Sequence, residues 1–170
     1  NFKTGNFHLN PTQVGIPNER PRYYCVAVMN GGRSTFLEKD DLKLPVKLYT
    51  SLPDLQIIPE ENVTNLPQIY DFLDQGLEKI ESLLVPPKIL NSNSSWCFDI
   101  VTPDSQNSAC FTSSYGRFVK GTGSVLFTGE IGKHSISLQN PQDRKFSDDW
   151  KDRLDEIEKS LRYFSGTEIA

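Results

Sequence analysis

Two stretches of the chain have the hydrophobic spacing of amphipathic helices. Residues 66–84 and 148–161 carry apolar side chains every three or four positions, so each stretch would present one apolar face. In the first stretch these residues are Ile69, Leu73, Leu77, Ile80 and Leu84. In the second, together with Phe164 just beyond it, they are Trp150, Leu154, Ile157 and Leu161. The pattern predicts two helices, each packed along its apolar face.

A continuous apolar run marks residues 22–29, RYYCVAVM. Aromatic and β-branched residues in such a run predict a strand that is covered on both faces. Shorter β-prone runs recur between residues 88 and 128 among Ser, Asn and Gly, which predicts an irregular, strand-containing lobe. With the two helices, these runs predict an α+β fold.

The last residues carry a helix start signal. Ser165 and Glu168 form the S-x-x-E pattern of a capping box, yet the chain ends at Ala170, before one or two turns are complete. At the front, strand-like residues begin without a preceding partner. We therefore expect both ends to be cut from a larger fold.

Charge and cysteine content narrow the possible functions. The 170 residues carry a net charge of −4, so any nucleic-acid role has to depend on a local basic patch. Three cysteines without repeated spacing argue against a disulfide framework and favour a reducing compartment, cytoplasmic or nuclear. No apolar run approaches the ~18 residues of a membrane helix. The two histidines do not share metal-ligand spacing with the cysteines, so we expect no metal site.

Arg20 and Arg22 stand directly before the apolar run. Residues two apart on a strand point to the same face, so the two guanidinium groups could be presented together. Such groups suit planar oxygen acceptors, including carbonyls, carboxylates and phosphates. A structural salt bridge or a solvated sheet edge is the alternative interpretation of the pair.

Three motifs together resemble one enzyme family. GIPNERPRYYCVAV (15–28) resembles the arginine motif of cytosine-5 methyltransferases, with Asn18 where the family has Gln. That change is shared by the branch of DNA methyltransferase homologues that methylates transfer RNA. CFTSSYGRFVKGTGSVL (110–126) and LRYFSGTEIA (161–170) resemble two further segments of this branch, and the three occur in the family's order.

The resemblance implies a covalent mechanism. In this family a cysteine thiolate attacks C6 of a cytosine taken out of its stack, C5 takes a methyl group from S-adenosylmethionine, and a base removes the C5 proton. By the family pattern Arg22 would stabilise charge at the cytosine O2 and Arg20 would order the pocket. The family's nucleophile follows a proline, whereas Cys25, Cys97 and Cys110 do not. We therefore expect the nucleophile, and most of the cofactor site, to lie in an N-terminal half outside this chain, which alone would be inactive.

The resemblance also implies that different regions of the chain have different roles. Residues 1–30 would end the catalytic sheet of an α/β S-adenosylmethionine-dependent methyltransferase fold, of which the chain is a fragment. Residues 31–160 would form a small mixed target-recognition lobe, and residues 161–170 would return to the catalytic domain. Arg162 would tie the lobe back to the catalytic sheet. Ser113 and Ser114 replace a Lys-Gly pair that is frequent in the family, which removes one positive charge.

Candidate substrate contacts fall within the Cys-Phe-Thr segment and the residues after it. Phe111 and Tyr115 are candidates for stacking on bases, or alternatively for core packing. Arg117 and Lys120 are candidates for phosphate contacts. The amides of residues 121–124 could approach a phosphate, or form a plain hairpin turn. Cys110 would lie near the active site without being the nucleophile, or be a quiet buried thiol. The full predicted set is Cys110, Phe111, Thr112, Tyr115, Arg117, Lys120, Gly121, Thr122, Gly123 and Ser124.

The sequence thus predicts the target-recognition portion of a transfer-RNA cytosine-5 methyltransferase. Its expected partners are the anticodon region of a transfer RNA and the N-terminal catalytic half of the same protein, with no membrane. A catalytically silent RNA- or protein-binding adaptor and a DNA cytosine-5 methyltransferase are the alternatives.

Overall fold

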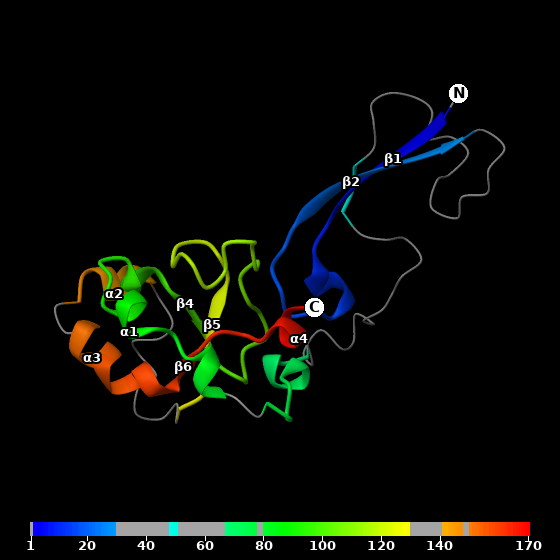
Figure 1. Cartoon of the computed structure of the whole chain (residues 1–170). Coiled ribbons are helices and arrows are strands. Elements are labelled where there is room, and N and C mark those ends of the chain that lie inside the picture. Colours follow the sequence, from blue (N-terminus) through cyan, green and yellow to red (C-terminus); the bar gives the residue numbers. More distant parts are fainter. Residues whose placement is uncertain (1, 30–47, 51–66, 78–79, 130–140, 148–149) are drawn as a thin grey trace. The chain divides into compact units, whose positions relative to one another are not determined.

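The computed structural model divides the chain into two compact units, Asn1–Leu66 (unit 1) and Pro67–Ala170 (unit 2) (Figure 1). The residues that the structure describes are 2–29, 48–50, 67–77, 80–129, 141–147 and 150–170. The functional division expected from the sequence, at residues 30 and 160, is a different one and stays a prediction.

Unit 1 contains a long hairpin. Strands β1 (Phe2–Leu9) and β2 (Arg22–Met29) pair antiparallel along their whole length. Strand β3 (Leu48–Tyr49) runs parallel to β1, which gives the strand order β2-β1-β3. Phe7 of β1 is buried and stacks on Tyr49, with ring centroids 5.2 Å apart. Strand β1 is therefore the central strand of this sheet, with β2 on one side and β3 on the other.

The predicted strand at residues 22–29 is confirmed, but its predicted burial is wrong. Side chains on both faces of β2 are exposed, and Tyr23 and Met29 keep 61% and 67% of their surface accessible. Within the described residues β2 is the edge strand of its sheet, so only β1 lies beside it. The apolar run that predicted a covered strand is thus an apolar surface of unit 1.

Unit 2 is built on a small mixed sheet. Strand β4 (Asp99–Val101) is parallel to β5 (Ser124–Phe127), and β5 is antiparallel to β6 (Leu161–Arg162). All four residues of the central strand β5 are buried. The helical segments of this unit are η3 (Ile69–Phe72), η4 (Ile80–Leu83), α1 (Pro87–Leu90), η5 (Ser95–Cys97), α2 (Pro141–Lys145), α3 (Trp150–Ile157), η7 (Glu158–Ser160) and α4 (Gly166–Ile169). The predicted α+β class is confirmed.

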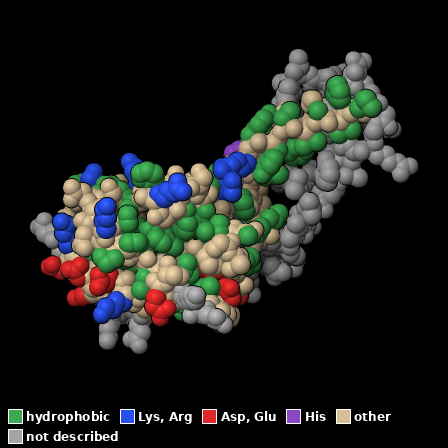
Figure 2. Space-filling model, viewed as in Figure 1, with side chains coloured by type: hydrophobic (Ala, Val, Ile, Leu, Met, Phe, Trp, Pro, Cys, Tyr) green, Lys and Arg blue, Asp and Glu red, His purple; other side chains and the backbone are tan. Residues whose placement is uncertain are grey.

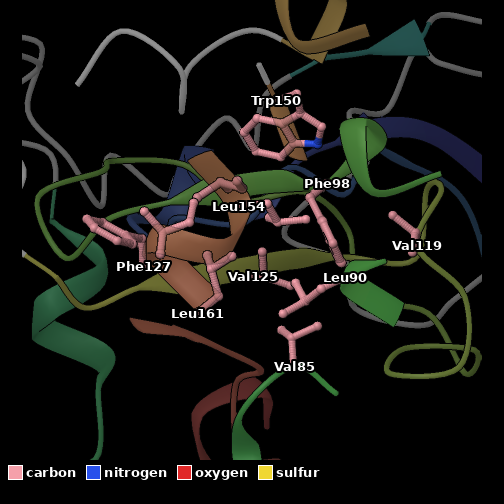
Figure 3. Close-up of a cluster of buried hydrophobic side chains, with 11 residues drawn as sticks. Val85, Leu90, Phe98, Val119, Val125, Phe127, Trp150, Leu154 and Leu161 are labelled. Carbon is pink, nitrogen blue, oxygen red and sulfur yellow. The ribbon is translucent and has the colours of Figure 1, made fainter. Parts of the chain in front are cut away.

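The core of unit 2 lies between the sheet and α3. Figure 3 shows side chains from both converging on one interior. The buried cluster consists of Val85, Leu90, Phe98, Ile100, Val119, Val125, Phe127, Trp150, Leu154, Ile157 and Leu161. The apolar face predicted for residues 148–161 is therefore confirmed, although the α-helix ends at Ile157 and Leu161 belongs to β6.

The helix predicted over residues 66–84 is wrong. Its described residues form two short 3-10 segments, η3 and η4, with a turn at residues 75–76 between them. Residues 66 and 78–79 of the predicted helix lie outside the described ranges. Backbone groups here bond across the unit instead of along a helix. Ile69 N donates to Ser105 O at 2.8 Å, and Leu83 O accepts from Tyr163 N at 2.7 Å. These tertiary hydrogen bonds pair backbone groups that a helix would have paired internally, and the amphipathic pattern does not reveal them.

Candidate functional site

Most of the predicted site residues lie in one loop that joins β4 to β5, residues 102–123 (the β4–β5 loop). The loop is closed at Ser124, the first residue of β5. Its hydroxyl accepts a hydrogen bond from Ala109 N at 2.7 Å and donates one to the Asp99 carboxylate of β4. Because Ser124 is fully buried, this junction holds the loop to the core of unit 2.

Phe111 and Tyr115 point into unit 2. Their rings meet edge to face with centroids 5.0 Å apart, and Phe111 meets Phe164 in the same way at 5.3 Å. The Tyr115 hydroxyl donates to Ser124 O at 2.6 Å and accepts from Phe164 N at 3.0 Å. Burial raises the pKa of Tyr115 well above its ordinary value, so the hydroxyl stays protonated. These contacts support the core-packing interpretation, and base stacking by either ring stays a prediction.

Gly123 packs under the same two rings. Its φ is 137°, and a Cβ at this position would lie 2.5 Å from Phe111 Cδ1 and 2.8 Å from Tyr115 Cδ2. Thr122 is buried too, and its hydroxyl donates to Phe118 O at 2.7 Å. Phosphate contact by these amides stays a prediction, for which Gly121 is the only residue of 121–124 that lies exposed.

The outer side of the loop is cationic. Arg117, Lys120 and Thr112 are exposed, whereas Cys110 is half-buried with its thiol directed at Phe111 O, 3.6 Å away. In Figure 2 Lys and Arg side chains gather along the upper edge of unit 2, and Asp and Glu gather along its lower edge. The predicted phosphate-binding residues are therefore on the surface, where contact with an anion is sterically open.

Sequence reasoning missed Phe118. This side chain is 67% exposed, although Val119 beside it is buried. The signal was present as an aromatic residue between two cations, in the string RFVK at 117–120. The resemblance to the family points to Phe111 and Tyr115 and gives no role to Phe118.

Arg20 and Arg22 are exposed in unit 1. Arg22 opens β2, and its Nη1 donates to Pro21 O at 3.0 Å. Arg20 precedes the strand, and its backbone N donates to the Asn10 side chain at 2.9 Å. Both guanidinium groups are thus accessible at the start of an exposed strand, and their catalytic role stays a prediction.

Arg162 is the centre of a buried ionic network. Its guanidinium forms a two-pronged ion pair with Glu168, with both N–O distances 2.8 Å. The same carboxylate accepts from Ser165 N at 2.8 Å and from Asp74 N at 3.1 Å. Burial alone would raise the pKa of Glu168, but these hydrogen bonds outweigh burial and hold the pKa below its ordinary value. The capping box predicted at Ser165 and Glu168 is confirmed.

The described residues lack two features. They contain no cluster of three or more His, Cys, Asp or Glu side chains arranged to hold a metal ion. Among the helices in these ranges, none has the length and apolar character required to cross a bilayer.

The chain is similar in sequence to known cytosine-5 methyltransferases. No family model matches the chain. A DNA (cytosine-5)-methyltransferase of Dictyostelium discoideum is 32% identical over 191 residues, covering 99% of this chain and 46% of that protein. A tRNA (cytosine(38)-C(5))-methyltransferase of Spodoptera frugiperda is 32% identical over 176 residues, with the same coverage. This chain is thus homologous to the cytosine-5 methyltransferases.

Solved structures narrow the class to one branch. The crystal structure of a Spodoptera frugiperda DNMT2 mutant matches with a TM-score of 0.69 and 27% identity, covering 99% of this chain and 45% of that one. The crystal structure of the Schizosaccharomyces pombe Dnmt2 methyltransferase matches with a TM-score of 0.65 and 25% identity, covering 98% of this chain and 42% of that one. The homologues are therefore cytosine-5 methyltransferases of the DNMT2 type. The chain spans about half the length of the curated relatives it matches.

Proposed function

We propose that this chain is the target-recognition portion of a transfer-RNA cytosine-5 methyltransferase. The observation that carries the proposal is the β4–β5 loop, which is fixed to a buried strand and exposes Arg117 and Lys120 in a chain of net charge −4. A local cationic surface on an acidic chain is what binding to a phosphate backbone requires. The homologues named as tRNA methyltransferases support transfer RNA as the proposed substrate class.

In the proposed function Arg22 and Arg20 have the catalytic role. Attack on C6 of a cytosine moves electron density toward the O2 carbonyl, and a guanidinium placed at that oxygen stabilises the charge as it develops. Arg22 is accessible for this contact, and Arg20 lies two residues before it. The attacking thiolate comes from outside this chain in the proposed arrangement.

The described residues do not fit an S-adenosylmethionine site of their own. In α/β folds a nucleotide-type cofactor is held by a glycine-containing turn that follows a parallel strand. Here the Gly-x-Gly pair, Gly121 and Gly123, precedes β5, and aromatic rings occupy the space beside Gly123. We propose that the remaining half of the protein binds the cofactor and that this chain alone does not methylate.

The exposed faces of β2 support a catalytic half as the partner. An edge strand with apolar side chains on both faces is costly in water and suits burial in a larger sheet. Tyr23, Tyr24 and Met29 provide this surface.

A chimera tests the proposed function. The 46% of the Spodoptera frugiperda tRNA methyltransferase that matches this chain is replaced by it, and methyl transfer to tRNA and to duplex DNA is measured. We expect transfer to tRNA, and we expect Arg22→Ala to lower kcat by about 10²–10³-fold, as for loss of an oxyanion donor. Lys151→Ala, which removes an exposed cation on α3, serves as the matched control and should leave kcat unchanged.

Two results decide against the proposal. A folded chimera that binds tRNA but transfers no methyl group would favour the silent adaptor. Transfer to duplex DNA in preference to tRNA would favour the DNA methyltransferase, as the name of the Dictyostelium discoideum relative suggests for that protein.

A further inference from the structure

Residues 117–120 (the RFVK segment) contain one exposed side chain, Phe118, that the proposed function does not use. Phe118 is 67% exposed, and Arg117 and Lys120 on either side of it are exposed as well. Only Val119 points inward, where it joins the main core cluster. An exposed phenyl ring leaves apolar surface in contact with water, and covering this surface would be favourable. The exposed Phe118 ring is therefore a candidate contact for a binding partner.

The ring is exposed on a fixed backbone. Arg117 N and Phe118 N both donate to Ser114 O, at 3.0 and 3.3 Å. The Thr122 hydroxyl donates to Phe118 O at 2.7 Å. Together with the buried Val119 side chain, these bonds hold the segment from both sides. Little backbone conformational entropy therefore remains to be lost when a partner covers the ring.

The charges around the ring define the chemistry of that partner. Among the described residues no acidic side chain forms an ion pair with Arg117 or Lys120. A partner that fits therefore combines a flat apolar face with negative charge on both sides of it. An unpaired nucleotide has this form, because its base stacks on an aromatic ring while the flanking phosphates meet cations.

We infer that Phe118 is a stacking platform for an unpaired nucleotide of the RNA substrate, with Arg117 and Lys120 contacting the adjacent phosphates. The inference rests on the proposed function, since it takes RNA as the substrate. It assigns the stacking role to Phe118 in place of Phe111 and Tyr115, whose rings are engaged inside unit 2.

Binding of a single-stranded RNA oligonucleotide to the 170-residue chain tests the inference, with fluorescence anisotropy as the readout. Phe118→Ala should weaken binding about 10-fold, or about 1.4 kcal/mol, and Phe118→Trp should restore it. Phe118→Leu keeps apolar area but lacks a π face, so it should stay weak. Phe146→Ala is the matched control, because Phe146 is 79% exposed in the same unit.

The salt dependence separates stacking from charge. Phe118→Ala should leave the slope of log Kd against log salt unchanged, whereas Arg117→Gln and Lys120→Gln should each reduce it by about 0.7 for a single strand. A fully base-paired RNA of equal length should show no effect of Phe118→Ala.

Several results would overturn the inference. These are wild-type RNA affinity in Phe118→Ala, an equal loss in Phe146→Ala, or binding of an acidic peptide that is as tight as RNA binding and is weakened equally by Phe118→Ala. Circular dichroism of each variant checks that the fold is intact, and Phe118→Trp keeps the test valid if Ala perturbs the loop. If the chimera methylates tRNA while Phe118→Ala binds RNA normally, the stacking role fails and the proposed function stands. If the chimera is inactive and no variant changes RNA binding, both fail.

Discussion

Replacing Glu168 by Gln should strongly destabilise unit 2. The side chains of Arg162 and Glu168 are 5% and 1% exposed, so their ion pair is screened from water. The carboxylate accepts four hydrogen bonds, two from Arg162 and one each from the amides of Ser165 and Asp74. In the Gln variant one acceptor oxygen becomes an NH₂ group that faces donors, and the Arg162 charge loses its counterion.

The size of the expected loss in free energy of unfolding follows from these contacts. Loss of two hydrogen bonds to a charged group costs about 3 kcal/mol, and breaking a buried ion pair from one side costs about 3–5 kcal/mol. We therefore expect Glu168→Gln to lower the free energy of unfolding by about 3–5 kcal/mol at pH 7. Urea denaturation followed by fluorescence of Trp96 and Trp150 measures this. Glu81→Gln is the control, because Glu81 is exposed and its change should stay within about 0.5 kcal/mol.

The effect should also depend on pH. The pKa of Glu168 is lower in the folded protein than in the unfolded chain, where it is about 4.3. Such a group stabilises the fold above the unfolded pKa, and this contribution is lost as pH falls through the folded pKa. The stability gap between wild type and Glu168→Gln should therefore shrink below about pH 4.3. A gap under about 1 kcal/mol at pH 7, or one that persists unchanged at acid pH, would refute the reasoning.

Three further variants test how the β4–β5 loop is held. Gly123→Ala should cost about 2 kcal/mol or more in urea denaturation, because its Cβ would meet the Phe111 ring at 2.5 Å and its φ is 137°. Gly121→Ala, with φ 67° and no atom within 4 Å of the added Cβ, should cost about 1 kcal/mol, and equal costs would contradict the packing argument. Tyr115→Phe should cost about 1–3 kcal/mol because Phe164 N loses its acceptor, and a neutral effect in the same denaturation assay would show that the bond contributes little.

The sequence predicted best the features that depend on local pattern. The apolar face of residues 148–161 and the capping box at Ser165 follow from spacing of three and four residues, and both are confirmed. The helix over 66–84 failed because distant partners, such as Ser105 O for Ile69 N, take up the backbone groups. The amino-acid sequence alone does not reveal such long-range hydrogen bonds.

Burial was the other property that pattern did not predict. The run at residues 22–29 resembles a covered strand, yet its side chains are exposed in the described structure. In the β4–β5 loop the aromatic residues reverse the expectation, because Phe111 packs inward while Phe118 lies outside. Loop residues alternate between core and surface according to tertiary contacts, and no period in the sequence reports them.

Target recognition is tested most directly by mapping the methylated base. tRNA is incubated with the chimera and S-adenosylmethionine, and the modified cytosine is located by mass spectrometry of nuclease fragments. We expect 5-methylcytosine at a single position in the anticodon region, and loss of that signal in Arg22→Ala. Methylation scattered over many cytosines, or none in a folded chimera whose parent enzyme is active, would contradict the assignment of target recognition to this chain.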